Sequence, residues 1–535
     1  KVFVALNSLL KPCDLNIAGK LLDKLNRYVK PDALIIQDLA LVQLVRQTGF
    51  AGELHLSTLA NVSFQDALKL IKKNPGVDKV VIPRELSIDE IKSMASACPK
   101  GLGLEVFVHG ALCYGVSGRC YWSSFLGGKS GLRGRCVQPC RRFYTQNGQT
   151  KRFFSCQDLS LDVLAKVLLS IPEIQTWKIE GRKKGPHYVF HTVKAYKLLR
   201  DHGKDPGMKK EALGLLANAL GRTGTHYNFL PQRPQNPVNI DIQTGSGLLV
   251  GKIQGAKQKP YIIPRQSLMP GDLLRLGYED DSWHCTYRIP KYIPKKGRIY
   301  IKLSSARKPR QDVPVFLIDR REKWLEEKLS VLEDMLIKTT ETDVAPSTFN
   351  ARLPGGYISR KRDESFEIHV HRNYGIGGQK GTTGVWMFPE GKYKSPKRVE
   401  PKLWWWLPPV IWPEDETKIK QQIDIAIKNQ SRNFVLNSPW QIVFFTNPKS
   451  LNLWAGPFCN IANALAINTL LNLGFSGVIV SPELDSQHFL QLPKDSPLPL
   501  GIVISGNWPL SISRILSPEF KTDTDFTSPK GEHGW

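Results

Sequence analysis

The sequence predicts an α/β protein that combines a TIM-like (β/α) barrel, a small all-β barrel domain and a degenerate C-terminal α/β repeat. Three observations lead to this fold class. Residues 1–225 alternate short β-branched runs with amphipathic helical patterns, which indicates a parallel sheet. Residues 236–319 change to short alternating runs separated by turn signals, which is typical of a small β barrel. Residues 451–535 are similar to part of the first region, so an internal repeat is the simplest interpretation.

The barrel region contains six segments with the composition of strands, separated by helical patterns. The helical pattern at 87–97 begins with Ser87 and has Glu90 three residues later, which is a capping box. Six βα units are two fewer than a closed eight-stranded barrel needs, and the sequence begins at Lys1 without a methionine. We therefore expect the first strands of the barrel to be missing from this sequence. The expected strands are 1–7, 32–38, 53–58, 77–85, 102–110 and 176–182.

A chain of 535 residues is too long for a single core, and changes of pattern divide it. In chain order the predicted domains are a barrel at 1–225, a β domain at 236–319, a helix and linker at 320–356, a mixed α/β region at 357–450 and the repeat at 451–535. Within the repeat, residues 458–486 parallel 56–88, and residues 500–514 parallel 102–119. The second copy has no cysteine where the first has Cys113. We expect it to keep the scaffold and to lose any metal chemistry.

The charge of the chain favours a polyanionic partner. Lysines and arginines number 74 against 48 acidic residues, a net charge of +26, and nucleic acid is the first polyanion to consider. Simple solubility is the alternative explanation. Residues 129–156 carry basic side chains and no acidic one, so we expect the anion there. No apolar run reaches the roughly 18–20 residues of a membrane span, so no membrane partner is expected.

Four of the nine cysteines fall within 28 residues, with six, fifteen and three residues between them. They are Cys113, Cys120, Cys136 and Cys140. Structural zinc sites usually use cysteines two to four residues apart, paired twice, and only the last pair fits that pattern. An iron–sulfur cluster tolerates irregular spacing, and the glycines between these cysteines give the backbone the freedom to wrap one. Zinc and free redox thiols stay open as alternatives at this point.

The other cysteines carry less information. Cys156 is a further candidate ligand, although a packed thiol is the simpler interpretation. The isolated cysteines are expected to pack in apolar interiors; they are Cys13, Cys98, Cys285 and Cys459. An odd number of cysteines spread over a long chain fits a reducing compartment better than a disulfide framework, so we expect a cytoplasmic protein.

The segments LEVFVHGALC, SGRC and GGKSGLRGRCVQPCR, followed by KIEGRKK and HYV, resemble peptidase family U32, the collagenase-like peptidase family. The resemblance covers residues 1–225 and a C-terminal stretch, and it is strongest to the branch that hydroxylates RNA bases. It implies a TIM-like barrel that carries a [4Fe–4S] cluster on Cys113, Cys120, Cys136 and Cys140. It also implies oxygen-independent hydroxylation at C5 of a pyrimidine in rRNA or tRNA, with prephenate as the oxygen donor. Related sequences often have Asn where this one has Leu132.

Barrel enzymes carry their chemistry at the carboxyl ends of strands, and the candidate residues follow from that position. The candidates for proton transfer are His55, His109 and Glu180. The candidates for binding substrate are Arg84, Glu85, Arg182 and Tyr188. The arginines among them would hold the carboxylates of a small co-substrate, and the tyrosine would stack on a base. The candidates for binding the RNA backbone are Arg133, Arg135, Arg141, Arg142, Lys183 and Lys184.

Two other classes of function stay open. A peptidase needs an activated nucleophile or a metal-bound water, and the sequence has neither a GxSxG nor an HExxH motif. A zinc-stabilised RNA-binding module without catalysis would also account for the cysteines and for the positive charge.

Overall fold

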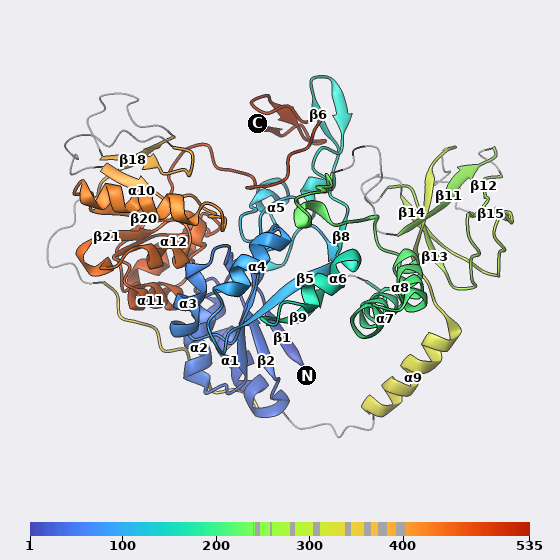
Figure 1. Ribbon diagram of the computed structural model, residues 1–535, viewed down its shortest axis with the longest axis horizontal. Coiled ribbons are helices and arrows are strands. Elements are labelled where there is room, and N and C mark those ends of the chain that lie inside the picture. The colour runs from blue at the N-terminus through green and yellow to red at the C-terminus, as the bar shows by residue number, and fades with distance from the viewer. Residues whose placement is uncertain are drawn as a thin grey trace.

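The computed structural model has mixed α/β architecture with two parallel-strand sheets (Figure 1). It describes residues 1–182, 184–238, 240, 247–256, 259–278, 284–302, 311–337, 344–357, 365–372, 382–391 and 403–535. Lys183 and part of the predicted linker at 338–356 lie outside the described residues. In the view of Figure 1, the first sheet lies in the middle, the second on one side of it and the small β domain on the other.

The first sheet is built from the six predicted strands, paired in parallel. In spatial order they are β1 (Phe3–Leu6), β2 (Ala33–Ile36), β3 (Glu53–Leu56), β4 (Lys79–Val81), β5 (Gly103–Ala111) and β9 (Ile174–Ile179). β8 (Asp158–Ser160) pairs antiparallel with the end of β5, and β10 (Gly224–Thr225) continues the sheet. Within the described part of the chain no pairing joins β1 to β9, so a closed TIM barrel is not confirmed.

Helices follow the strands of this sheet, as the alternating pattern predicts. They are α1 (Asp14–Lys24), α2 (Ala40–Thr48), α3 (Asp66–Lys73), α4 (Ile88–Ser96), α6 (Ala165–Leu169), α7 (Pro186–His202) and α8 (Pro206–Asn218). The capping box of α4 is confirmed, because Ser87 and Glu90 exchange side-chain and backbone hydrogen bonds. Side chains alternate across a strand, so one face of each strand packs on these helices and the other lines the concave side.

The second sheet has seven parallel strands. They are β17 (Ile368–His371), β18 (Thr382–Trp386), β19 (Leu403–Trp406), β20 (Asn433–Leu436), β21 (Asn452–Ala455), β22 (Gly477–Ile479) and β23 (Leu500–Gly501). Its helices are α10 (Glu416–Lys428), α11 (Ala464–Leu473) and α12 (Ser486–Gln491). The order β21–α11–β22–α12–β23 repeats β3–α3–β4–α4–β5, as the internal similarity predicts. Both predicted segments, 357–450 and 451–535, contribute strands to this one sheet.

The two parallel sheets share one hydrophobic core. Phe64 of the first half stacks on Phe444 of the second, with ring centroids 5.1 Å apart. The amide of Asn463 donates to the buried carboxylate of Asp38 at 3.1 Å, and helices α2 and α11 pack together. The halves are therefore joined through buried apolar and polar contacts.

The small β domain is a six-stranded antiparallel sheet with its own core. In spatial order its strands are β14 (Cys285–Arg288), β13 (Leu273–Leu276), β16 (Pro314–Asp319), β11 (Leu248–Gln254), β12 (Tyr261–Ile262) and β15 (Ile299–Tyr300). Among the described residues no pairing closes β14 onto β15, so a closed barrel is not clearly shown. α9 (Lys323–Ile337) follows the last strand. No described helix has the length and apolar content to cross a membrane.

Candidate functional site

The cysteine-rich segment, residues 113–140, forms a loop at the carboxyl end of β5, and we call it the cysteine loop. It contains one short α-helix, α5 (Trp122–Gly127). The C-terminal tail runs beside it: Val116 N–H donates to the carbonyl of Ile512 at 2.7 Å, and Tyr121 N–H donates to that of Leu510 at 2.8 Å. The loop is therefore held by a segment almost 400 residues away in sequence.

An aromatic cluster packs against one side of the cysteine loop. It consists of Trp122, Tyr144, Phe153, Phe154 and Phe526, and the side chains of Cys120 and Cys140 pack against it. The tail takes part again through β24 (Phe526–Thr527), which pairs with β6 (Tyr144–Gln146) just after the loop. Burial in this cluster fixes one side of the loop and leaves the other facing outward.

The four cysteines of the loop are free thiols that lie within electrostatic range of one another. Cys113 and Cys136 are exposed, whereas Cys120 and Cys140 are partly buried. Burial raises the pKa of the Cys120 thiol to about 11 and that of Cys140 well above its usual range. A metal bound by these thiols would have to displace their protons.

The spacing of the sulfurs bears on which metal they could hold. In a tetrahedral zinc site the sulfurs would lie about 3.8 Å apart. Among the described residues, one group of three potential metal ligands has all its ligand atoms within 4.8 Å of one another. This group lies outside the cysteine loop. The backbone N–H of Gln138 donates to the Cys136 sulfur at 3.3 Å, a contact of the kind that tunes cluster-bound thiolates.

Charged residues from two strand ends meet beside the loop. Arg84, after β4, donates to the carbonyl of Ala111 at 2.5 Å, and its guanidinium lies 3.6 Å from the carboxylate of Glu180, after β9. Arg182 lies against the loop, because a Cβ on Gly134 would come within 3.3 Å of its guanidinium. The structure thus brings Arg84, Glu180 and Arg182 to the start and middle of the cysteine loop.

Glu85 and Tyr188 are buried rather than open to a ligand. Glu85 accepts from the backbone N–H of Ser117 at 3.1 Å, and burial raises its pKa. The hydroxyl of Tyr188 donates to the carbonyl of Glu180 at 3.1 Å. Both side chains hold the surroundings of the loop in place.

Two of the predicted RNA-binding arginines are engaged within the protein. Arg133 pairs with Asp14 at 2.7 Å. Arg141 donates to the carbonyls of Cys156 and Leu112 at 2.6 and 3.3 Å. These guanidiniums tie the loop to the rest of the fold.

The remaining basic candidates differ in exposure. Arg135 is exposed, and Arg142 is half-buried. The ammonium of Lys184 lies over the ring of Tyr188, 5.0 Å from its centroid. Lys183 lies outside the described residues.

His109, near the end of β5, lines a cleft of about 730 Å³ between the first sheet and the small β domain. Its Nδ1 lies 3.2 Å from the hydroxyl of Ser160, which donates its own proton to Asp162 at 2.8 Å. His109 Nδ1 must therefore carry the proton, which leaves Nε2 as the acceptor nitrogen. Burial lowers the pKa of His109 to about 4, so it is a neutral base at neutral pH.

His55 belongs to another region. It is fully buried, its Nε2 lies 2.8 Å from the carboxylate of Glu53, and its ring packs edge-on against Phe3 at 5.0 Å. Both partners are the first residues of their strands. These contacts join His55 to the amino-terminal edge of the sheet, away from the cysteine loop.

Three arrangements were missed by sequence reasoning. Asp158, in β8, is buried and ion-paired with Arg222 at 3.1 Å at the wall of the cleft. The other two are a pair of histidines on α7 with Glu322, and a contact between Cys13 and His488. The spacing of the two histidines in HYVFH was visible in the sequence, because residues four apart share one face of a helix. Cys13 is exposed, so the prediction that it packs in an apolar interior is wrong.

The fold and the site define a protein with two parallel-strand α/β sheets and a four-cysteine loop at the carboxyl edge of the first. Residues 1–239 match the model of peptidase family U32.

Several curated proteins are similar to the same part of the chain. The chain is 31% identical over 251 residues to tRNA hydroxylation protein P of Helicobacter pylori, a match that covers 44% of this chain and 58% of the relative. It is 34% identical over 207 residues to a 23S rRNA 5-hydroxycytidine synthase of Escherichia coli, a match that covers 38% of this chain and 31% of the relative. It is 30% identical over 260 residues to a collagenase of Porphyromonas gingivalis, covering 44% and 60%. The chain thus spans about half the length of the curated relatives it matches, or less. No solved structure matches it significantly.

Proposed function

We propose that this protein is an iron–sulfur-dependent, oxygen-independent RNA hydroxylase that acts at C5 of a pyrimidine in rRNA or tRNA, with prephenate as the oxygen donor. The observation that carries the proposal is the grouping of four free, mutually coupled cysteines on one loop at the carboxyl edge of a parallel sheet. The net charge of +26 and the relatives named for tRNA and rRNA hydroxylation support an RNA substrate.

Cys113, Cys120, Cys136 and Cys140 would hold a [4Fe–4S] cluster. The N–H···S contact from Gln138 and the neighbouring guanidiniums of Arg84 and Arg141 suit it. When bound, the cluster would supply redox chemistry beside the strand ends. A cysteine loop supported on its inner side by the aromatic cluster would keep solvent from that side.

The residues of the chain itself would bind and position the reactants. Arg182 and Arg84 would hold the carboxylates of the donor, since a guanidinium binds a carboxylate with two parallel hydrogen bonds. The cleft lined by His109 has the volume of a small-ligand site. His109 would accept a proton there through Nε2, because its other nitrogen is committed to Ser160.

The test is chemical and spectroscopic. Anaerobically purified protein is expected to contain about four irons and four sulfides per chain, and the Cys136→Ser/Cys140→Ser variant is expected to lose them. RNA from cells lacking the protein would be compared by mass spectrometry with RNA from cells carrying either form, and the wild type alone should add one oxygen to a pyrimidine. Colourless wild-type protein, or hydroxylation that survives in the variant, would overturn the proposal.

A second candidate function is thiol peptidase activity, favoured by one specific arrangement. The sulfur of Cys13 lies 3.3 Å from Nε2 of His488, whose Nδ1 lies 2.6 Å from the carboxylate of Asp485. Cys13 also precedes the first turn of α1, where a helix favours a thiolate. A nucleophile, a base and an orienting carboxylate in this order form the set that acyl transfer uses. Gelatin cleavage lost in Cys13→Ala and kept in Cys136→Ser/Cys140→Ser would support it; no cleavage by the wild type would exclude it.

A further inference from the structure

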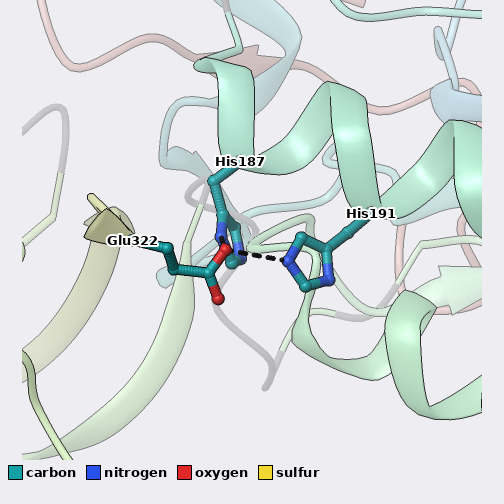
Figure 2. A group of neighbouring side chains, drawn as sticks. All are labelled: His187, His191 and Glu322. Carbon is teal, nitrogen blue, oxygen red and sulfur yellow. Dashed lines mark hydrogen bonds and ion pairs between the residues drawn. The ribbon is translucent and has the colours of Figure 1, made fainter. Parts of the chain in front are cut away.

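His187, His191 and Glu322 form a compact group outside the cysteine loop. The two histidines come from successive turns of α7, and Glu322 lies between the last strand of the small β domain and α9. Figure 2 shows the Glu322 carboxylate facing both imidazole rings. His187 Nδ1 and His191 Nε2 each lie 3.2 Å from the same carboxylate oxygen.

The hydrogen bonds of His187 leave its Nδ1 without a proton to donate to Glu322, and a cation could bridge the two atoms. Its Nε2 lies 3.0 Å from the carbonyl of Asn218, which can only accept, so Nε2 carries a proton. A neutral imidazole has one N–H, so Nδ1 then presents a lone pair to the Glu322 oxygen. Two acceptors face each other at 3.2 Å, unless the ring is an imidazolium, the carboxyl group is protonated or a cation is shared between them.

The distances favour the cation. A charge-assisted N–H···O contact is usually about 2.7–2.9 Å long, which is shorter than both contacts to Glu322. In a tetrahedral zinc site with ligands at about 2.0–2.1 Å, neighbouring ligand atoms lie about 3.3 Å apart. The two 3.2 Å contacts are close to this distance between neighbouring ligand atoms. A metal-binding histidine also typically donates its other N–H to a backbone carbonyl, as His187 does to Asn218.

We propose that His187, His191 and Glu322 bind a divalent transition-metal ion, with Zn²⁺ as the best fit to two imidazoles and one carboxylate. The side chains of His191 and Glu322 are 12% and 22% exposed, so water reaches the fourth position. The ion joins two parts of the fold: α7 belongs to the family-matched region, and Glu322 follows the small β domain. It therefore fixes the β domain against the half that carries the cysteine loop.

The site also adjoins the cleft. Asn218 ends α8, whose residues Leu213 and Leu216 line the cleft, and Phe316 of β16 lines the opposite wall. A metal that pins the start of α9 to α7 therefore sets the distance between the two walls. Phe190 of α7 and Trp324 of α9 pack edge-on beside it, with ring centroids 4.8 Å apart.

The test uses the whole chain, stripped with a chelator and reloaded with zinc. Wild-type protein is expected to bind one zinc with nitrogen and oxygen ligands at about 2.0–2.1 Å by X-ray absorption, and its Tm should rise with added zinc. His191→Ala and Glu322→Gln should each weaken this zinc at least about tenfold and abolish the rise in Tm. Glu322→Gln keeps the size of the side chain, so weaker zinc binding in this variant would result from the loss of a metal ligand and not from altered packing.

His202→Ala is the matched control, because His202 is exposed on the same helix and should leave zinc binding unchanged. Zinc held by the cysteine loop would be recognised by sulfur ligands at about 2.3 Å. A wild type with sulfur-bound zinc alone would overturn the proposal. So would nitrogen- and oxygen-bound zinc that survives in both variants.

Discussion

Replacing His109 by Asn should change how the stability of the protein depends on pH. His109 is buried at the end of β5, and burial lowers its pKa to about 4, although Asp158 and Asp162 act in the opposite direction. Asn places an amide nitrogen near the position of Nδ1, so it can still donate to Ser160. The variant therefore removes the titrating nitrogen and keeps the local hydrogen bond.

The magnitude follows from the difference between two pKa values. An unfolded histidine titrates near 6.5, and the folded one titrates near 4. Between those values the unfolded chain binds a proton that the folded chain does not, so the free energy of unfolding falls as the pH falls through this window. A difference of about 2.5 units at 1.36 kcal/mol each gives a loss of about 3 kcal/mol, complete below pH 4.

Urea denaturation at several pH values between 7 and 4 measures this loss. The wild type should lose about 3 kcal/mol more than His109→Asn across the window, whereas His202→Asn, an exposed change, should follow the wild type. Every other titrating group is shared by the proteins and cancels in the comparison. Parallel curves for wild type and His109→Asn would refute the assignment of a neutral buried imidazole.

Three further changes test other parts of the fold. Arg514→Met removes two hydrogen bonds to the buried carboxylate of Glu90, at 2.8 and 2.9 Å, and should lower the free energy of unfolding by about 3 kcal/mol. A decrease of less than about 1 kcal/mol would mean that this ion pair contributes little to stability. Phe444→Ala opens a cavity against Phe64 between the two halves and should cost about 3–5 kcal/mol by the same assay; a smaller effect would mean that this junction contributes little. Burial raises the pKa of Asp38 from 3.8 to about 6, so the free energy of unfolding of the wild type should fall as the pH rises between these values. Asp38→Asn should remove this dependence on pH, and an unchanged dependence would show that another group titrates there.

The strands of the first sheet could be predicted because each signal is local. The run from 102 to 110 is nearly all apolar, as a strand buried on both faces requires, and it forms β5 at Gly103–Ala111. Ser87 and Glu90 predicted the start of α4 for the same reason, since both partners of a capping box lie within one turn. The position of Arg84 and Glu180 at the carboxyl ends of β4 and β9, the two parallel strands that flank β5, could be predicted from the strand pattern.

The remaining features depend on contacts that no local pattern encodes. Arg133 looks like a basic residue available to RNA, yet its partner Asp14 lies 119 positions away. Cys13 looks like an isolated thiol, and only the docking of the second half brings His488 to it. Closure of the barrel is also a global property, because it depends on whether the edge strands β1 and β9 find partners.

The second half of the chain lacks the cysteines, but its contacts explain why the loop needs it. Asn460 accepts from the hydroxyl of Tyr121 at 2.8 Å and donates to the carbonyl of Gly118 at 2.9 Å. Arg119, also buried, donates to the carbonyl of Asn437 at 3.2 Å. These contacts hold the backbone around Cys120 from the second half of the chain. The second half of the chain therefore acts on the cysteine loop as a structural support that fixes the backbone next to Cys120.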